Sequence, residues 1–337
     1  MIRMAINGFG RIGRQAFKIA FERRDVEIVA INDLTDAETL AHLLKYDTNY
    51  GIYERPVKVD GKTLVVGTKK IPIVAEPDPV KLPWKKYKVD VVLECTGRFT
   101  DPAAASQHLE AGAKKVVLSA PAKGKSVKTV VLGVNEEVVD NDDRIISNAS
   151  CTTNCIAPVM QILENEFGVE KAMMTTVHSY TASQRLTDAP AKDLREARSA
   201  AENIVPTTTG ASTAAAQTIP SLKNKFNGLS VRVPSPVVSL SDITALLSVN
   251  VTVEQLNRVF KRAAKEPYYQ GILAVTDEPL VSSDLRGNAH STIVDLSLTD
   301  VVDGNMVKVV AWYDNEWGYS NRLVELATDF AKIKLEK

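Results

Sequence analysis

Cysteine, histidine and aromatic residues are scarce in this chain of 337 residues. It contains only Cys95, Cys151 and Cys155, four histidines and 6% aromatic residues. Three cysteines are too few for the disulfide framework typical of secreted proteins. We therefore expect a reducing compartment and a cytoplasmic location.

Excess charge of either sign is absent as well, because 41 Lys and Arg residues balance 41 Asp and Glu residues. A zero net charge gives no bulk attraction to nucleic acid or to an anionic membrane, so neither is expected as a primary partner. The first residues, MIRMAINGFGRIG, begin a strand directly and lack the apolar core of a secretory signal. No apolar run reaches the length of a membrane span.

Hydrophobic residues make up 45% of the chain, enough for a large core, and the length suits two domains. Apolar strands that stop at small or polar residues recur in DVVLECTG (90–97), KKVVLSAP (114–121) and RIISNAS (144–150). Helical stretches separate some of these strands. This alternation predicts an α/β fold with a doubly wound parallel sheet over residues 1–150.

Beyond residue 150 the pattern changes to longer segments of alternating polarity, such as AMMTTVHSY and MVKVVAWYD. Such segments favour a larger mixed sheet that is mostly antiparallel. We expect residues 151–317 to form this second, α+β domain, with catalytic, substrate-binding and oligomerisation roles. An apolar stripe predicts a last helix over 318–337 that packs back on the first domain.

The stretch GFGRIG has the pattern G-x-G-x-x-G, with glycines at Gly8, Gly10 and Gly13. It follows a predicted strand and precedes a predicted helix, and Asp33 comes 20 residues after Gly13. This context is typical of a Rossmann-type dinucleotide site, in which the carboxylate accepts hydrogen bonds from the adenosine ribose. The same carboxylate would repel the extra phosphate of NADP, so NAD is expected. The alternative is a glycine loop without a ligand.

The stretch SNASCTTNCIAP (147–158) places two cysteines four residues apart. Zinc normally takes four ligands in close pairs, and no second pair follows, so no metal is expected. A disulfide conflicts with reducing conditions and with the usual cysteine geometry. Cys155 suits a structural role one turn into an apolar helix, whereas Cys151, at an expected helix N-terminus, suits a nucleophile.

A nucleophilic cysteine needs a base, and TTVHSYT places His178 at the end of a predicted strand. A lone histidine is more often structural. Beside a nicotinamide, however, a Cys–His pair would oxidise an aldehyde through a thiohemiacetal and a thioester. The stretch PTTTGAS (206–212), with Arg198 and Arg232, suggests bound phosphate. Its alternative is a threonine-rich turn with surface arginines.

Six motifs occur in a characteristic order: NGFGRIGR, SNASCTTNCIAP, TVHSYT, PTTTGA, RVPSP and YDNEWGYS. With them the chain resembles, over nearly its whole length, the phosphorylating, NAD-dependent glyceraldehyde-3-phosphate dehydrogenase family of glycolysis and gluconeogenesis. The resemblance implies oxidation of glyceraldehyde 3-phosphate with inorganic phosphate to 1,3-bisphosphoglycerate. It also implies a homotetramer in which residues 181–202, the S-loop, reach a neighbouring subunit's cofactor.

The resemblance implies a role for each matching residue. Cys151 would be the nucleophile and His178 the residue that activates it. The NAD contacts would come from Gly8, Gly10, Arg11, Ile12, Gly13, Asp33, Thr96, Ser119 and Asn315. Contacts to the substrate C3 phosphate would come from Thr181 and Arg232, and contacts to inorganic phosphate from Ser150, Thr152, Thr209 and Gly210.

Three positions depart from the family's common pattern: Pro77, Thr213 and Val237. None carries an expected catalytic role. Two alternatives stay open at this point. One is erythrose-4-phosphate dehydrogenase, a relative that hydrolyses the thioester. The other is a non-catalytic protein that binds NAD or RNA on this scaffold.

Overall fold

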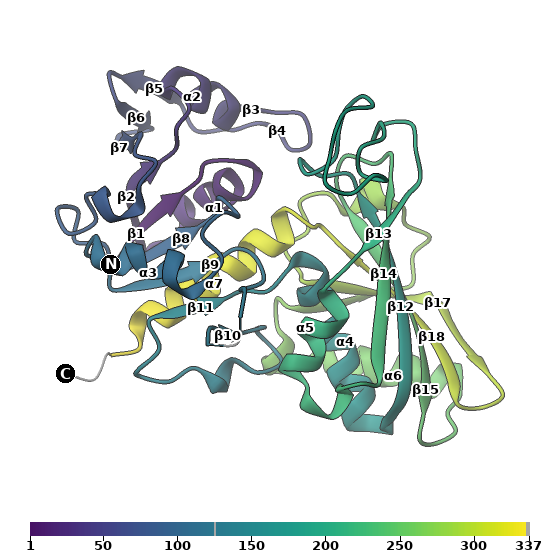
Figure 1. The fold of residues 1–337 in the computed structure, drawn as a ribbon. Coiled ribbons are helices and arrows are strands. Elements are labelled where there is room, and N and C mark those ends of the chain that lie inside the picture. The colour runs from purple at the N-terminus through teal and green to yellow at the C-terminus, as the bar shows by residue number, and fades with distance from the viewer. Residues whose placement is uncertain (125, 335–337) are drawn as a thin grey trace. The chain divides into compact units, whose positions relative to one another are not determined.

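The computed structural model describes residues 1–124 and 126–334, and the chain divides into two compact units (Figure 1). Unit 1 contains Met1–Val130, Glu136–Ala149 and the segment that begins at Ser320, and unit 2 contains Val131–Asn135 and Ser150–Tyr319. The assignment of residues 1–150 to a cofactor-binding domain and of residues 151–317 to a catalytic domain stays a prediction. In the described part of the chain, no helix is long and apolar enough to cross a membrane.

Unit 1 is built on a nine-stranded sheet in the order β10-β11-β9-β8-β1-β2-β7-β6-β5. Its strands are β1 (Ile2–Asn7), β2 (Val26–Asn32), β5 (Val57–Asp60), β6 (Thr63–Val66), β7 (Lys69–Val74), β8 (Val91–Glu94), β9 (Lys115–Leu118), β10 (Lys128–Thr129) and β11 (Ile145–Ser147). All neighbours from β10 to β7 are parallel, whereas β5 and β6 add an antiparallel edge. From β1 the chain first adds β2 on one side of β1 and later adds β8 on the other side. The strand order therefore reverses between β1 and β8, which is a topological switch point.

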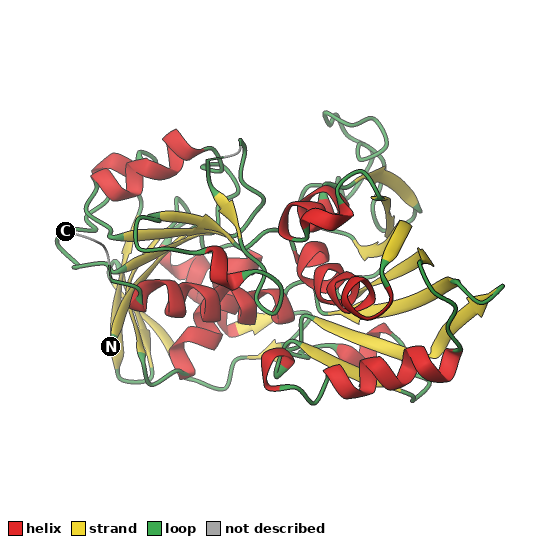
Figure 2. Cartoon of the chain, turned by 90° about the horizontal axis from the view of Figure 1, so that it is seen from below, coloured by secondary structure: helices red, strands yellow, loops and turns green. Residues whose placement is uncertain are grey.

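Helices pack against this sheet, and Figure 2 shows helices beside the strands in both units. They are α1 (Arg11–Glu22), α2 (Ala37–Lys45), α3 (Pro102–Glu110) and α7 (Trp317–Lys332), and a small hairpin of β3 (Tyr46–Asp47) and β4 (Gly51–Ile52) follows α2. Every residue of β8 and β9 is buried, as expected for central strands of a parallel sheet. The expected α/β fold with a doubly wound sheet is confirmed.

The last helix differs in length from the expected 318–337. It begins at Trp317 and ends at Lys332, and residues 335–337 lie outside the described residues. Near this end, Lys115 Nζ donates to the carbonyl oxygens of Phe330 and Ile333 at 2.7 and 2.9 Å. A buried ammonium thus helps to satisfy carbonyl oxygens at the end of the helix, and that of Phe330 also accepts from Ile333 N at 3.2 Å.

Unit 2 contains a seven-stranded mixed sheet in the order β13-β14-β12-β15-β18-β17-β16. Its strands are β12 (Val169–Ser179), β13 (Val205–Thr208), β14 (Phe226–Val233), β15 (Ser239–Leu247), β16 (Leu273–Thr276), β17 (Thr292–Val302) and β18 (Met306–Tyr313). Only the β12–β14 and β16–β17 pairs among these described strands are parallel, so the expectation of a mostly antiparallel sheet is confirmed.

Three helices pack side by side on this second sheet: α4 (Cys151–Phe167), α5 (Ala211–Thr218) and α6 (Val253–Ala263). The central helix, α4, contacts both α5 and α6 as well as β12, β15, β17 and β18. This packing fixes the N-terminus of α4 relative to the strand ends beside it. The chemistry described next depends on that placement.

Candidate active site

Cys151 is the first residue of α4. Ser150 caps the helix, because its hydroxyl oxygen accepts a hydrogen bond from the backbone N–H of Thr153 at 3.1 Å. Just before the cap, Ala149 has a φ of +54°, in the left-handed region that a residue with a side chain seldom adopts. This tight turn from β11 into α4 presents the Cys151 sulfur at the helix N-terminus, where the helix dipole favours a thiolate.

His178 lies against this sulfur. Its Nε2 is 3.5 Å from Cys151 Sγ, and its Nδ1 is 2.7 Å from the carbonyl oxygen of Ser179. The Ser179 carbonyl can only accept and favours the tautomer with the proton on Nδ1, which leaves Nε2 as an acceptor facing the thiol, whereas Arg232 Nη1, which can only donate, approaches the same Nδ1 and favours the other tautomer. The structure thus brings together the two residues that the sequence analysis paired.

Arg232 reaches the same imidazole because the sheet places it there. His178 in β12 and Arg232 in β14 are partners in a parallel pair, and Arg232 Nη1 approaches His178 Nδ1. Burial, and then the positive charge of Arg232, lowers the pKa of His178 from its ordinary 6.5 to about 3. His178 is therefore neutral, the form that can accept a proton.

The two cysteines of the motif have different surroundings. Burial raises the pKa of the Cys151 thiol, while the charge of Arg232 acts in the opposite direction, and the residue keeps part of its surface exposed. Cys155 is fully buried, with its sulfur 3.6 Å from Thr292 Oγ1 and 3.8 Å from the carbonyl oxygen of Ala311. Burial raises the pKa of Cys155 to about 12, so it is an inert core thiol.

Tyr313, at the end of β18, was not singled out in the sequence. Its hydroxyl lies 2.8 Å from the hydroxyls of both Thr152 and Thr176, and its ring meets His178 edge-on with centroids 6.0 Å apart. Thr176 donates to the carbonyl oxygen of Leu240, so Tyr313 donates to Thr176 and Thr152 donates to Tyr313. This ordered chain of hydroxyls ties α4 to β12 and β18. The one sequence feature that could have drawn attention to Tyr313 is its position directly before the DNEWG stretch.

Asn315 follows Tyr313 and is held by two serines. Its Oδ1 accepts hydrogen bonds from the hydroxyls of Ser179 and Ser239, both at 3.0 Å. The orientation of the amide is therefore set by its neighbours, since a hydroxyl proton must face the oxygen and not the NH₂ group. An amide fixed in this way suits the recognition of another amide.

The expected phosphate residues fall at three separate places in unit 2. Thr209 and Gly210 precede α5, and Gly210 is its N-cap, with open space where a side chain would lie. Thr181 contacts Ser183 through its hydroxyl, at 3.0 Å. Arg198, considered as a phosphate partner, instead pairs with Asp188 at 2.9 Å on an exposed loop. Of the two arginines, Arg232 is the one beside the Cys–His pair.

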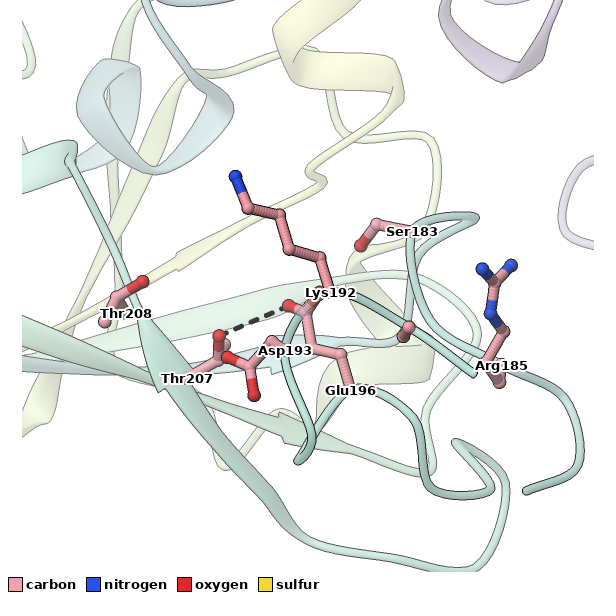
Figure 3. A pocket seen from close by; sticks show the side chains of 8 residues that line it. Ser183, Arg185, Lys192, Asp193, Glu196, Thr207 and Thr208 are labelled. Carbon is pink, nitrogen blue, oxygen red and sulfur yellow. Dashed lines mark hydrogen bonds between the residues drawn. The ribbon is translucent and has the colours of Figure 1, made fainter. Parts of the chain in front are cut away.

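A hollow of about 640 Å³ is lined both by residues of the S-loop and by Thr207 and Thr208 of the PTTTGAS stretch (Figure 3). Its lining includes two basic side chains, Arg185 and Lys192, and two carboxylates, Asp193 and Glu196. Figure 3 shows the Thr207 hydroxyl bonded to Glu196, at 3.2 Å. The charges balance, so this hollow has no excess positive charge with which to select an anion.

In unit 1, the glycine turn follows β1 at the switch point. A Cβ on Gly13 would lie 2.1 Å from the carbonyl oxygen of Gly8, and Gly8 itself has a φ of +91° and packs on Thr96. Gly10, by contrast, is the N-cap of α1, and no other atom lies within 4 Å of the place that a Cβ on it would take. Open space over uncapped helix N–H groups is what a pyrophosphate needs.

Asp33, directly after β2, stabilises this turn by accepting hydrogen bonds. One carboxylate oxygen accepts from Phe9 N at 2.7 Å and the other from Thr35 N at 3.0 Å. Thr96 and Ser119 follow β8 and β9 at the same edge of the sheet. Arg11 directs its guanidinium to Asp47, at 2.8 Å, so its contribution at the turn is its backbone N–H. These residues fit a dinucleotide with two ribose hydroxyls.

Comparison with known proteins agrees with this description. Residues 2–102 match the family described as glyceraldehyde 3-phosphate dehydrogenase, NAD binding domain, and residues 150–315 match its C-terminal domain. The chain is 54% identical over 331 residues to glyceraldehyde-3-phosphate dehydrogenase of Geobacillus stearothermophilus, and the match covers 98% of each chain. It is 54% identical over 333 residues to glyceraldehyde-3-phosphate dehydrogenase 1 of Bacillus subtilis, again with 98% of each chain covered. For the Zymomonas mobilis protein of the same family name the identity is 50% over 333 residues, which is 98% of this chain and 99% of the other.

Proposed function

This chain belongs to the glyceraldehyde-3-phosphate dehydrogenase family, and from that membership we propose a role for each residue of its site. The chain is an NAD-dependent oxidoreductase. Its reaction is the phosphorylating oxidation of glyceraldehyde 3-phosphate to 1,3-bisphosphoglycerate. The observation that carries the proposal is the 3.5 Å contact between Cys151 Sγ and His178 Nε2.

Cys151 is the nucleophile and His178 the general base. As the sulfur forms its bond to the aldehyde carbon, the thiol proton passes to His178 Nε2, which then gives it to the former carbonyl oxygen, and this oxygen becomes the hydroxyl of a thiohemiacetal. The carbonyl of Ser179, 2.7 Å from Nδ1, favours the tautomer whose Nε2 can accept this proton. We assign to the N–H groups at the start of α4 the stabilisation of the negative charge that develops on this oxygen.

His178 acts again when the thiohemiacetal loses its hydroxyl proton. NAD, which the glycine turn and Asp33 would hold, would supply the two-electron acceptor for oxidation of the thiohemiacetal to a thioester. Attack of inorganic phosphate on the thioester then breaks the carbon–sulfur bond and returns Cys151. The product is the mixed anhydride of the acid and phosphate.

NAD is held by residues whose geometry suits it. We assign the pyrophosphate to the glycine turn of Gly8, Gly10 and Gly13, with the backbone N–H groups of Arg11 and Ile12. Asp33 accepts from the adenosine ribose. Thr96 and Ser119 line the cofactor site, and Asn315 binds the nicotinamide carboxamide through its fixed amide.

Arg232 couples substrate binding to catalysis in this proposal. With Thr181 it holds the C3 phosphate of the substrate. Burial, and then the charge of Arg232, keeps the pKa of His178 low, and a phosphate dianion on Arg232 would offset the second of these causes, so the base becomes stronger when substrate is present. Binding and activation of the base would then occur together.

Inorganic phosphate is assigned to Ser150, Thr152, Thr209 and Gly210. The hydroxyl proton of Thr152 is directed to Tyr313, so Thr152 contributes its backbone N–H at the start of α4. Gly210 offers the N-terminus of α5. The organisation we propose is a cytoplasmic homotetramer, in agreement with the balanced charge and the S-loop.

Turnover with and without phosphate tests the reaction. NADH formation from glyceraldehyde 3-phosphate should require inorganic phosphate, because water is a poor substitute at the thioester. Erythrose 4-phosphate serves as the comparison substrate. Equal rates with phosphate omitted, or a preference for erythrose 4-phosphate, would contradict the phosphorylating assignment.

A further inference from the structure

Glu94 is a buried carboxylate outside the groups that the reaction uses. It ends β8 and is 1% exposed. Oε1 accepts from the backbone N–H and the hydroxyl of Thr96, and Oε2 accepts from Asn7 Nδ2 and His108 Nε2. Each oxygen thus receives two donors, which fills the four acceptor positions of a carboxylate. Glu94 therefore has no acceptor position left for a ligand.

The direction of these hydrogen bonds is fixed by residues farther out. Trp84 Nε1 donates to His108 Nδ1 at 3.0 Å, so His108 carries its proton on Nε2 and donates to Glu94. On the other side, Asn7 Oδ1 accepts from Asn32 Nδ2 at 2.7 Å. Asn32 in turn is held by the backbone N–H and carbonyl of Glu76.

This network joins the strand ends that carry the expected NAD contacts. Asn7 ends β1 directly before Gly8, and Asn32 ends β2 directly before Asp33. Thr96 lies two residues after Glu94 and against Gly8. The buried carboxylate of Glu94 is therefore linked by hydrogen bonds to the strand ends that carry the glycine turn and Asp33, and directly to Thr96.

We propose that Glu94 is a positioning residue for NAD, which through Asn7, Asn32 and Thr96 fixes the strand ends that contact the cofactor. This inference rests on the proposed cofactor site. Glu94 touches no cofactor atom itself. His108 and Trp84 support it by setting the one tautomer that donates to the carboxylate.

A carboxylate is required at this position because all four partners donate. In one orientation a glutamine would direct its NH₂ group at the donors of Asn7 and His108, and in the other at Thr96, whose hydroxyl can rotate to accept but whose backbone N–H cannot. If the Asn7 amide rotated to accept from the glutamine, its NH₂ group would face the NH₂ group of Asn32. If the Asn32 amide rotated as well, its NH₂ group would face the backbone N–H of Glu76 and its oxygen the carbonyl of Glu76. Shifting the proton of His108 moves it to the indole N–H of Trp84. The mismatch thus has no local relief.

The test is the affinity of folded Glu94→Gln protein for NAD, measured by isothermal titration calorimetry. We expect the Kd to rise about tenfold or more, because each reversed hydrogen bond shifts a strand end. The KM for NAD should rise similarly, whereas the alkylation rate of Cys151 without NAD should not change. A residue that only stabilises the fold would lower the melting temperature and leave the Kd of folded protein unchanged.

Asp90→Asn is the matched control. Asp90 is a carboxylate of the same sheet that also bonds β1, through Arg3 N at 2.9 Å, but at the ends of the strands away from the turn. It should change stability without changing the Kd. His108→Leu is a second variant, which keeps the charge and removes one donor, and we expect the Kd to rise roughly threefold.

Each outcome is decisive. Wild-type protein that does not bind NAD would contradict the proposed cofactor site and, with it, the role of Glu94. Wild-type protein that binds NAD, with Glu94→Gln or His108→Leu at the same Kd, overturns the inference. If Glu94→Gln does not fold, the result with His108→Leu decides alone.

Discussion

The imidazole of His178 contacts the sulfur of Cys151 at 3.5 Å, although 27 positions separate the two residues in the chain. The contact exists because α4 starts beside the end of β12, and Tyr313 holds both elements through Thr152 and Thr176. Both residues belong to unit 2, so the pair is complete within one compact part of the chain.

Cys151 should be the most reactive thiol. Burial raises the pKa of all three thiols, to about 12 for Cys95 and Cys155, whereas at Cys151 the positive charge of Arg232 opposes the rise and His178 offers a proton acceptor at 3.5 Å. With iodoacetamide at neutral pH, we expect modification of Cys151 to be at least about tenfold faster. Mass spectrometry of peptides at successive times measures the three rates. Similar rates for all three would argue against an activated Cys151.

His178→Asn should lower the turnover number by about 10² to 10⁴, because proton transfer by a placed base typically supplies that factor. The KM for NAD should stay close to that of the wild type, since His178 lies in unit 2 and the glycine turn in unit 1. Steady-state kinetics measure both. His42→Asn, at an exposed position on α2, is the control and should keep full activity. An active His178→Asn variant would place the base elsewhere.

Arg232→Gln should raise the pKa of His178, because it removes the positive charge beside Nδ1. Burial is the larger cause of the lowered pKa, so the new value should stay below 6.5. Titration of the histidine resonances by NMR would show the change. Arg232→Lys keeps the charge and should shift the pKa less. An unchanged titration in Arg232→Gln would mean that the guanidinium does not control this base.

Acid should destabilise the protein partly through His178. Unfolded chain binds a proton at a pKa near 6.5, whereas the folded chain binds it only near 3. Between these values the unfolded state holds more protons, so the free energy of unfolding falls as the pH drops, by at most about 1.4 kcal/mol per pH unit from this group. Urea denaturation of wild type and His178→Gln from pH 7 to 4 measures the slope. Parallel curves would contradict the prediction, and His42→Gln should match the wild type.

Two glycines of the turn should respond differently to alanine. A Cβ on Gly13 would meet the Gly8 carbonyl at 2.1 Å, so Gly13→Ala should destabilise the fold by a few kcal/mol. Gly10 faces open space, so Gly10→Ala should fold normally but weaken NAD binding, because the methyl group occupies room for the pyrophosphate. Thermal unfolding and NAD titration separate the two effects. Unchanged NAD affinity in Gly10→Ala would move the pyrophosphate away from this residue.

The sequence predicts well those features that repeat along the chain. Strand and helix periodicity predicted the two sheet types, and the glycine spacing predicted the turn before α1. The bonds of Tyr313 and the surroundings of Glu94 could not be predicted in this way. Each joins residues from several distant strands through single hydrogen bonds, and such bonds leave no periodic pattern. The pairing of Arg198 with Asp188 was missed for the same reason, since two charges in a loop can face in any direction.

The pairing of His178 with Arg232 across β12 and β14 limits how this active site can tolerate inserted residues. One extra residue inside β14 would slide Val231 or Val233 into the place of the guanidinium, and the imidazole would then border an aliphatic side chain. Lengthening the connection between α5 and β14 leaves the alignment untouched. Length variation in natural or engineered homologues should therefore concentrate in the connections, and the two strands should keep a constant number of residues.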